Sequence, residues 1–290
     1  MTSAQAAGRF LAAQPAEVPL LVALDIDGTL VGDDRVITPN TERAVVAARQ
    51  AGHHLVLATG RSIVGMLPVA HALGLTTGWA VASSGSVIVR LDPDARAGYV
   101  VEEAHTFDVE PVAGLVHEAQ PDLLLAVEEL GWGYRTSARL PDGMLNGQQR
   151  VVALEEIWSR PTTRVILWGV GALELAGALG ALGLTVTRSG PCSLDVTPLG
   201  FSKATALEKV RRRLGVGPEN TVAVGDNYND IDMLRWAARS VAMGHAPADL
   251  RTIAGEVTGT ICEHGVVDVL RSITPTGRPC QRARRSTTAP

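Results

Sequence analysis

Two aspartates follow an apolar run near the start of the sequence. Residues 18–27 read VPLLVALDID, so Asp25 and Asp27 end a run typical of a strand buried on both faces of a parallel sheet. Alternation along the strand predicts both carboxylates on the same side, and Gly28 then permits a turn. Two carboxylates this close repel, so a cation such as Mg²⁺ must bind or the pKa of one must rise. The alternative is an ordinary Asp-Gly turn whose aspartate only caps a helix.

Three further polar segments stand at the ends of predicted strands or the start of a helix. Residues 59–61 (TGR) follow the strand predicted over 54–58, and residues 225–230 (GDNYND) follow the strand predicted over 221–224. Lys203 opens the helix predicted over 202–214. Each segment alone is more often a turn, a solvated charge or a helix cap. Together they bring carboxylates, a hydroxyl and a cation to one sheet edge, where open α/β sheets bind ligands.

The elements that must position these residues alternate between strand and helix. Thr38 and Pro39 predict a helix start, and the helix ends at Gly52. A strand over 54–58, a helix over 63–73 and a strand over 79–89 complete a βαβαβ unit of a parallel sheet.

The stretch between 89 and 194 reads differently, because strand-like pieces mix with helical pieces. We predict an α/β fold with a Rossmann-like parallel-sheet core, residues 18–88 and 195–272, and an inserted α+β cap domain, residues 89–194. Residues 1–17 are predicted to be a flexible segment and residues 273–290 a disordered basic tail.

Composition excludes several classes of protein. The 290 residues carry a formal net charge of −4, which gives no reason to expect nucleic acid binding. About 18 uncharged apolar residues in a row would be needed to span a membrane, and the sequence has no such run. The three cysteines, Cys192, Cys262 and Cys280, are far apart and support neither a disulfide scaffold nor a zinc site. We therefore expect a cytoplasmic protein that binds neither membrane nor nucleic acid.

The order of these segments resembles the haloacid dehalogenase (HAD) superfamily of phosphatases. DIDGTL, TGR, Lys203 and GDNYND are similar to its four motifs in their usual order. The insertion between the second and third motifs, and the segment LDVTPLGFSKATAL over 194–207, resemble Cof-type members with a large α/β (type C2B) cap.

The resemblance implies a role for each motif residue. Asp25 would be the nucleophile that becomes an aspartyl-phosphate, Asp27 the general acid and base, and Lys203 the cation that neutralises both Asp25 and the phosphoryl group. Mg²⁺ would be held by the Asp25 carboxylate, the Asp27 backbone carbonyl and Asp226, while Asp230 would support that site and orient Lys203. The remaining implied phosphate-binding residues are Thr59, Gly60, Arg61, Ser84 and Asn229.

Three segments depart from the Cof-type pattern. Ser83-Ser84-Gly85 stands where Ser-Asn-Gly is usual, Met243-Gly244-His245-Ala246 where Met-Gly-Asn-Ala is usual, and His264-Gly265-Val266 where Asp-Gly-Val is expected. None of these removes a motif residue, but they leave the substrate and the roles of His245 and His264 open. We interpret both histidines as loop hydrogen-bonding residues. A pH-sensitive contact near the site is the alternative.

The predicted function is Mg²⁺-dependent hydrolysis of a small phosphorylated metabolite, a sugar or polyol phosphate, through an aspartyl-phosphate. A sugar phosphomutase and a non-catalytic sugar-phosphate-binding protein are the alternatives. Residues 128–135 contain acidic and aromatic side chains that could contact a sugar, although an ordinary exposed loop is the favoured interpretation.

Overall fold

The computed structural model describes residues 18–32 and 34–274 of the chain. The segment predicted to be flexible, residues 1–17, lies outside these ranges. Most of the predicted basic tail, residues 275–290, also lies outside them. Its first two residues are described, and Ile273 is the last residue of the last helix.

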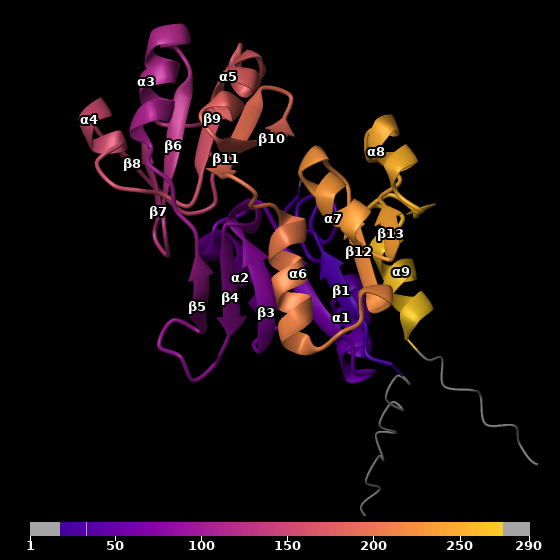
Figure 1. Ribbon diagram of the computed structural model, residues 1–290. Helices are drawn as coiled ribbons and strands as arrows, with labels where there is room; N and C mark the ends of the chain where they lie inside the picture. Colours follow the sequence, from indigo (N-terminus) through magenta and orange to yellow (C-terminus); the bar gives the residue numbers. More distant parts are fainter. Residues whose placement is uncertain (1–17, 33, 275–290) are drawn as a thin grey trace, which may run out of the picture.

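An eight-stranded sheet forms the larger part of the molecule, in the order β14-β13-β12-β1-β2-β3-β4-β5 (Figure 1). Strands β14 to β3 run parallel, whereas β4 and β5 are antiparallel additions at one edge. The strands are β1 (Leu21–Leu24), β2 (His54–Ala58), β3 (Gly78–Ala82), β4 (Val87–Leu91), β5 (Tyr99–Ala104), β12 (Thr221–Gly225), β13 (Arg239–Ala242) and β14 (Glu256–Val257).

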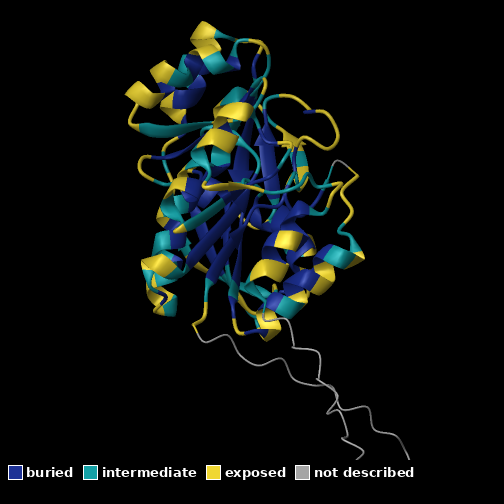
Figure 2. Cartoon of the chain, turned by 90° about the vertical axis from the view of Figure 1, so that its right-hand side faces the viewer, coloured by how far each residue is buried: buried dark blue, intermediate teal, exposed yellow. Residues whose placement is uncertain are grey.

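Helices cover both faces of this sheet. Helices α1 (Pro39–Gln50), α2 (Ile63–Ala72) and α9 (Gly265–Ile273) pack on one face, and α6 (Lys203–Leu214), α7 (Ile231–Trp236) and α8 (Ala248–Ile253) on the other. All four residues of β1 are fully buried between the two layers. Figure 2 shows this buried centre running through the strands, as expected for a parallel sheet covered on both sides.

Capping interactions define the start of α1 and both ends of α6. The predicted start of α1 is confirmed, because the Thr38 side chain accepts a hydrogen bond from the Thr41 amide. Ser202 and Thr205 form a reciprocal capping box at the start of α6, and Gly215 ends that helix in the left-handed conformation. Lys203 is therefore the first residue of a well-anchored helix.

A second sheet is inserted between β5 and α6, and it lies beyond the carboxyl ends of the parallel strands (Figure 1). We refer to this insertion as the cap. Its strand order is β10-β11-β9-β6-β7-β8, and all pairs are antiparallel except β7 with β8. The cap strands are β6 (Leu124–Glu129), β7 (Gly133–Thr136), β8 (Gln148–Val151), β9 (Val165–Trp168), β10 (Leu184–Gly190) and β11 (Ser193–Pro198).

The cap helices cover only one face of the cap sheet. They are α3 (Glu110–Ala119), α4 (Leu154–Ile157), the 3₁₀ turn η2 (Ala172–Leu175) and α5 (Ala176–Ala181). The opposite face is turned toward the parallel strands of the core. The predicted combination of a Rossmann-like core with an inserted α+β cap is confirmed by this arrangement.

Two details of the sequence prediction are wrong. The strand predicted over 79–89 is two antiparallel strands, because Ser83, Ser84 and Gly85 have positive φ angles and reverse the chain between β3 and β4. The predicted cap boundaries of 89 and 194 also differ from the sheets. Strand β5 belongs to the core sheet and β11 to the cap sheet, since antiparallel pairing extends a parallel sheet without a crossover helix.

Candidate active site

Three distant segments converge on the amino group of Lys203. Its Nζ lies 2.6 Å from Asp25 Oδ1 and 2.6 Å from Asp230 Oδ1. All three side chains are buried, and that of Lys203 is only 1% exposed. One carboxylate oxygen from each of Asp25, Asp226 and Asp230 lies within 4.8 Å of the others. The convergence of the first, third and fourth motif segments, predicted from their strand ends, is therefore present.

Adjacent parallel strands bring these aspartates together. Strand β1 pairs with β12, and the Asp25 amide donates to the Val224 carbonyl at 3.1 Å, so Asp25 and Asp226 leave the sheet side by side. The turn after Asp27 then brings Gly28, with φ +83°, against the Asp226 carboxylate. A Cβ at position 28 would overlap that carboxylate, so a glycine is required for both its conformation and the close approach.

Burial and mutual repulsion make the carboxylates reluctant to ionise. Burial, and next the charge of Asp230, raise the pKa of Asp25 well above its usual range, although Lys203 opposes the shift. Burial and Asp230 likewise raise the pKa of Asp226 to about 7. Burial would lower the pKa of Lys203, but the charges of Asp230 and Asp25 outweigh it and raise that pKa. The site therefore holds more negative charge than one lysine balances.

The donor atoms of this cluster fit a hard divalent cation. Both oxygens of Asp230 are already engaged, because Oδ1 accepts from Lys203 and Oδ2 accepts from the backbone amides of Asp226 and Asn227 at 3.0 Å each. Asp25 and Asp226 are left as the carboxylates that could face an ion. Oxygen-only donors with excess negative charge are the environment that Mg²⁺ prefers.

Asp27 does not join this cluster. Its carboxylate forms a two-pronged ion pair with Arg61, with Nε to Oδ2 at 2.8 Å and Nη2 to Oδ1 at 2.5 Å. The side chain of Asp27 is 61% exposed, whereas that of Arg61 is 10% exposed. Repulsion was predicted between Asp25 and Asp27, but the crowded carboxylates are those of Asp25, Asp226 and Asp230, and Asp27 has a cation of its own.

A cavity of about 420 Å³ lies between the core and the cap. Asp25 and Asp27 line it together with three of the predicted phosphate-binding residues, Gly60, Arg61 and Asn229. Asn229 Oδ1 is buried and has no hydrogen-bond partner among the described residues, which leaves it available to a ligand.

The other two predicted phosphate-binding residues are buried. The Thr59 hydroxyl accepts a hydrogen bond from the Arg61 amide at 3.0 Å and shapes the loop after β2. The Ser84 hydroxyl donates to Asp195 of the cap at 2.7 Å, so this side chain joins the core to the cap.

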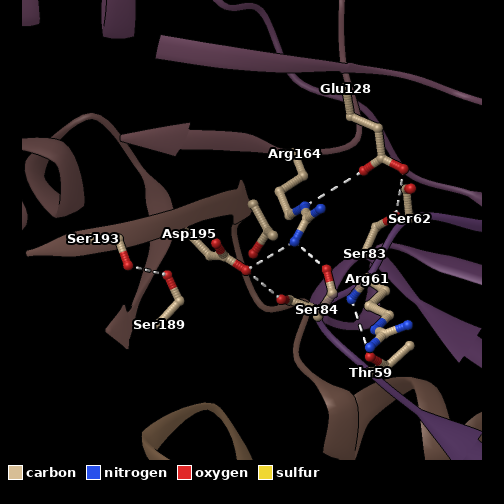
Figure 3. A network of polar contacts seen from close by, with 12 residues as sticks. Thr59, Arg61, Ser62, Ser83, Ser84, Glu128, Arg164, Ser189, Ser193 and Asp195 are labelled. Carbon is tan, nitrogen blue, oxygen red and sulfur yellow. Dashed lines mark hydrogen bonds and ion pairs between the residues drawn. The ribbon is translucent and has the colours of Figure 1, made fainter. Parts of the chain in front are cut away.

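Sequence reasoning missed the cap residues that complete the cavity. Figure 3 shows Arg164 between Asp195 and Glu128, above the loop that contains Thr59 and Arg61. The Arg164 guanidinium donates to Asp195 Oδ2 at 3.2 Å, to the Tyr134 hydroxyl at 2.5 Å and to the Gly60 carbonyl.

Arg164 directly precedes β9 (Val165–Trp168), and no pattern in the sequence indicated its role. Asp195 lies within the segment that resembles Cof-type members, but that resemblance assigned it no role.

The interpretation of residues 128–135 as an ordinary exposed loop is wrong. Residues 128 and 129 end β6, and residues 133–135 belong to β7. Glu128 is buried and accepts a hydrogen bond from the Ser83 hydroxyl at 2.8 Å, and burial raises its pKa. Tyr134 is also buried, and it lines the cavity.

Comparison with known proteins agrees with the site geometry. The family model described as haloacid dehalogenase-like hydrolase matches residues 22–136 and 174–270. The chain belongs to the haloacid dehalogenase-like hydrolases.

Relatives within this family are phosphatases. One is a 5-amino-6-(5-phospho-D-ribitylamino)uracil phosphatase of Bacillus subtilis, 27% identical, with 87% of this chain and 94% of the relative covered. Another is a pyridoxal phosphate phosphatase of Escherichia coli, 30% identical, with 82% and 93% covered. A solved haloacid dehalogenase-like hydrolase from Bacteroides thetaiotaomicron is 25% identical, with a TM-score of 0.74 and coverage of 88% and 99%. The predictions of a Cof-type HAD phosphatase, and of a phosphoric monoester hydrolase, are confirmed.

The two histidines that distinguish this HAD chain lie in different surroundings. His245 Nε2 is 3.7 Å from Asp226 Oδ2, so this imidazole adjoins the acidic cluster. His264 precedes α9 with φ 60°, and its Nδ1 is buried without a partner among the described residues.

In the described ranges, the HAD fold has no helix with the length and apolar character needed to cross a bilayer.

Proposed function

We propose that this HAD enzyme is a Mg²⁺-dependent phosphatase that hydrolyses a small phosphorylated metabolite, a sugar or polyol phosphate, through an aspartyl-phosphate on Asp25. The observation that carries the proposal is the position of Lys203, at 2.6 Å from both Asp25 and Asp230 beside the Asp226 carboxylate. A buried lysine between carboxylates favours the ionised form of Asp25 and neutralises charge on an incoming phosphoryl group.

In the first step a carboxylate oxygen of Asp25 attacks phosphorus. Oδ1 accepts the Lys203 hydrogen bond, which leaves Oδ2 as the free oxygen. The new bond joins Oδ2 to phosphorus, and the bond between phosphorus and the ester oxygen breaks. Once its ion pair with Arg61 has opened and it has taken a proton from solvent, Asp27 gives that proton to the departing alkoxide, which leaves as an alcohol.

In the second step a water molecule hydrolyses the acyl phosphate. Asp27, now ionised, takes a proton from the water as its oxygen attacks phosphorus. The bond between phosphorus and Oδ2 breaks, which releases inorganic phosphate and restores the Asp25 carboxylate. Because Asp27 is held by Arg61, we expect this pair to open when the phosphoryl group enters and Arg61 to turn toward the phosphate.

The metal would be held by Asp25, Asp226 and the backbone carbonyl of Asp27. When bound, Mg²⁺ supplies positive charge to the phosphoryl oxygens and to the nucleophile. Asp230 stays with Lys203 and two backbone amides, so it orients the site without being a ligand.

The cavity supports a small substrate. It lies between core and cap, and the contacts of Arg164, Ser83 and Ser84 close the cap onto the core, which would obstruct a protein or nucleic acid chain. Two curated relatives are named for phosphate esters of small metabolites. We propose a cytoplasmic enzyme with a small-molecule partner.

Phosphate release from a panel of sugar and polyol phosphates tests the proposal. With Mg²⁺ we expect the wild-type protein to turn over substrate without a bisphosphate activator, and we expect Asp25→Asn to lose this activity. Asp268→Asn, on the exposed side of α9, is the matched control and should stay active. No phosphate release from any ester would overturn the proposal and favour the non-catalytic binding protein.

A further inference from the structure

The cap sheet presents an apolar strip to the cavity beyond its polar end. Alternate residues of β9 point to opposite faces, and Val165 and Leu167 are buried under the cap helices. Ile166 and Trp168 point the other way, are half-buried and line the cavity. An aromatic side chain that opens into a site beside phosphate-handling groups is a candidate for ligand contact.

The polar and apolar ends of this face are separated along the strand. Arg164 contacts the Gly60 carbonyl and therefore marks the end nearest the phosphate-binding loop. Trp168 is four residues further along, about 13 Å at a strand rise of roughly 3.3 Å per residue. A leaving group that reaches from the nucleophile to the indole must be longer than a compact sugar.

Small and apolar residues make up most of the far end of the cavity, and the Arg35 guanidinium, which donates to the Gly143 carbonyl at 2.7 Å, also belongs to the lining. Trp168 is paired with Ser193 of the neighbouring strand β11, and at this end the β10–β11 hairpin contributes residues 189–193 (SGPCS) to the lining. Met144 adds a further apolar wall from the loop before β8. This surrounding suits a flat group that can stack on the indole.

We propose that Ile166 and Trp168 form a ring-binding subsite, and that the substrate is a phosphate ester whose hydroxylated chain ends in a planar ring. The proposal rests on the proposed function and names the substrate class of the same cavity. The ring would stack on the indole, while the chain would lie along Arg164 and Asp195 toward Asp25.

A matched pair of esters tests the subsite. One is ribitol 5-phosphate, and the other is the same ribityl phosphate with an aminouracil ring attached. For the wild-type enzyme we expect a kcat/KM at least about tenfold higher for the ring-bearing ester, since stacking contributes on the order of 1–3 kcal/mol. Trp168→Ala should lower the ratio of the two kcat/KM values about tenfold, chiefly through KM, and Trp168→Phe should keep most of it.

Val170→Ala is the control, because Val170 lies just beyond β9 and is 95% exposed. It should leave the ratio unchanged. Equal kcat/KM values for both esters in the wild type, or an equal loss for both in Trp168→Ala, would overturn the subsite. The proposed phosphatase would survive either result. Only the absence of phosphate release from these two esters and from every ester of the panel above would count against the phosphatase itself.

Discussion

Replacing Lys203 by methionine removes the only cation within hydrogen-bond distance of Asp25 and Asp230 in the described parts of the chain. The methionine side chain is similar in length and apolar, so it can occupy the buried space. The variant therefore isolates the charge, and it leaves three carboxylates facing one another in a site almost closed to solvent.

The size of the effect follows from the distances. A pair of unit charges at 2.6 Å interacts by roughly 6 kcal/mol at an effective dielectric of about 20, and Lys203 has two such partners. Desolvation offsets most of this attraction, and removal of one partner from a buried pair typically costs about 3–5 kcal/mol. We expect Lys203→Met to lose this amount of unfolding free energy at pH 8 in the absence of divalent cations.

The loss should shrink as the pH falls. A carboxyl whose folded-state pKa is raised, such as Asp25 or Asp226, binds more protons in the folded than in the unfolded protein, so its protonation stabilises the fold at low pH. At pH 5.5 the uncompensated carboxyls can be neutral, and Lys203 contributes less. Urea unfolding of both proteins in EDTA at the two pH values measures the difference.

Lys209→Met is the matched control on the same helix. Lys209 also pairs with a carboxylate at 2.6 Å, that of Glu103, but its side chain is 38% exposed. Such a pair contributes at most about 1 kcal/mol. Equal losses for the two variants, or a loss for Lys203→Met that does not change with pH, would refute the electrostatic reasoning.

Three further outcomes are expected. Gly28→Ala should weaken Mg²⁺ binding at least about tenfold by calorimetry, because its Cβ would displace Asp226. Gly52→Ala, with φ +93° and open space around it, should cost only about 1 kcal/mol of stability and leave the metal affinity intact. The metal-free wild type should lose about 2 kcal/mol of unfolding free energy between pH 5.5 and 8, because Asp226, with a pKa of about 7, ionises in the folded protein over this range. Urea titrations measure this loss, and saturating Mg²⁺ should abolish it. Arg164→Lys should lower kcat/KM roughly tenfold or more and reduce the melting temperature, since lysine cannot bridge Asp195, Tyr134 and Gly60; unchanged kinetics would contradict this.

The core was predictable because local patterns decide it. The apolar run before Asp25, the Thr38 cap and the glycine stops each act over a few residues, and parallel strands bring their carboxyl ends to one edge. The strand at 79–89 was predicted wrongly because the local pattern was the only information available there. A run of strand-forming residues does not reveal that two serines take left-handed conformations and reverse the chain.

The sequence by itself determined the motif order, which predicted Asp25, Asp27, Lys203 and Asp226 as the residues for the chemistry and placed them at one sheet edge. Only the tertiary structure decided which group each of them faces. Asp27 pairs with Arg61, Asp230 is occupied by Lys203 and two amides, and Arg164 closes the cap over Gly60. Such pairings depend on how the cap docks onto the core. The contacting residues are 104 positions apart for Arg164 and Gly60 and 111 for Ser84 and Asp195, and no local pattern encodes such contacts.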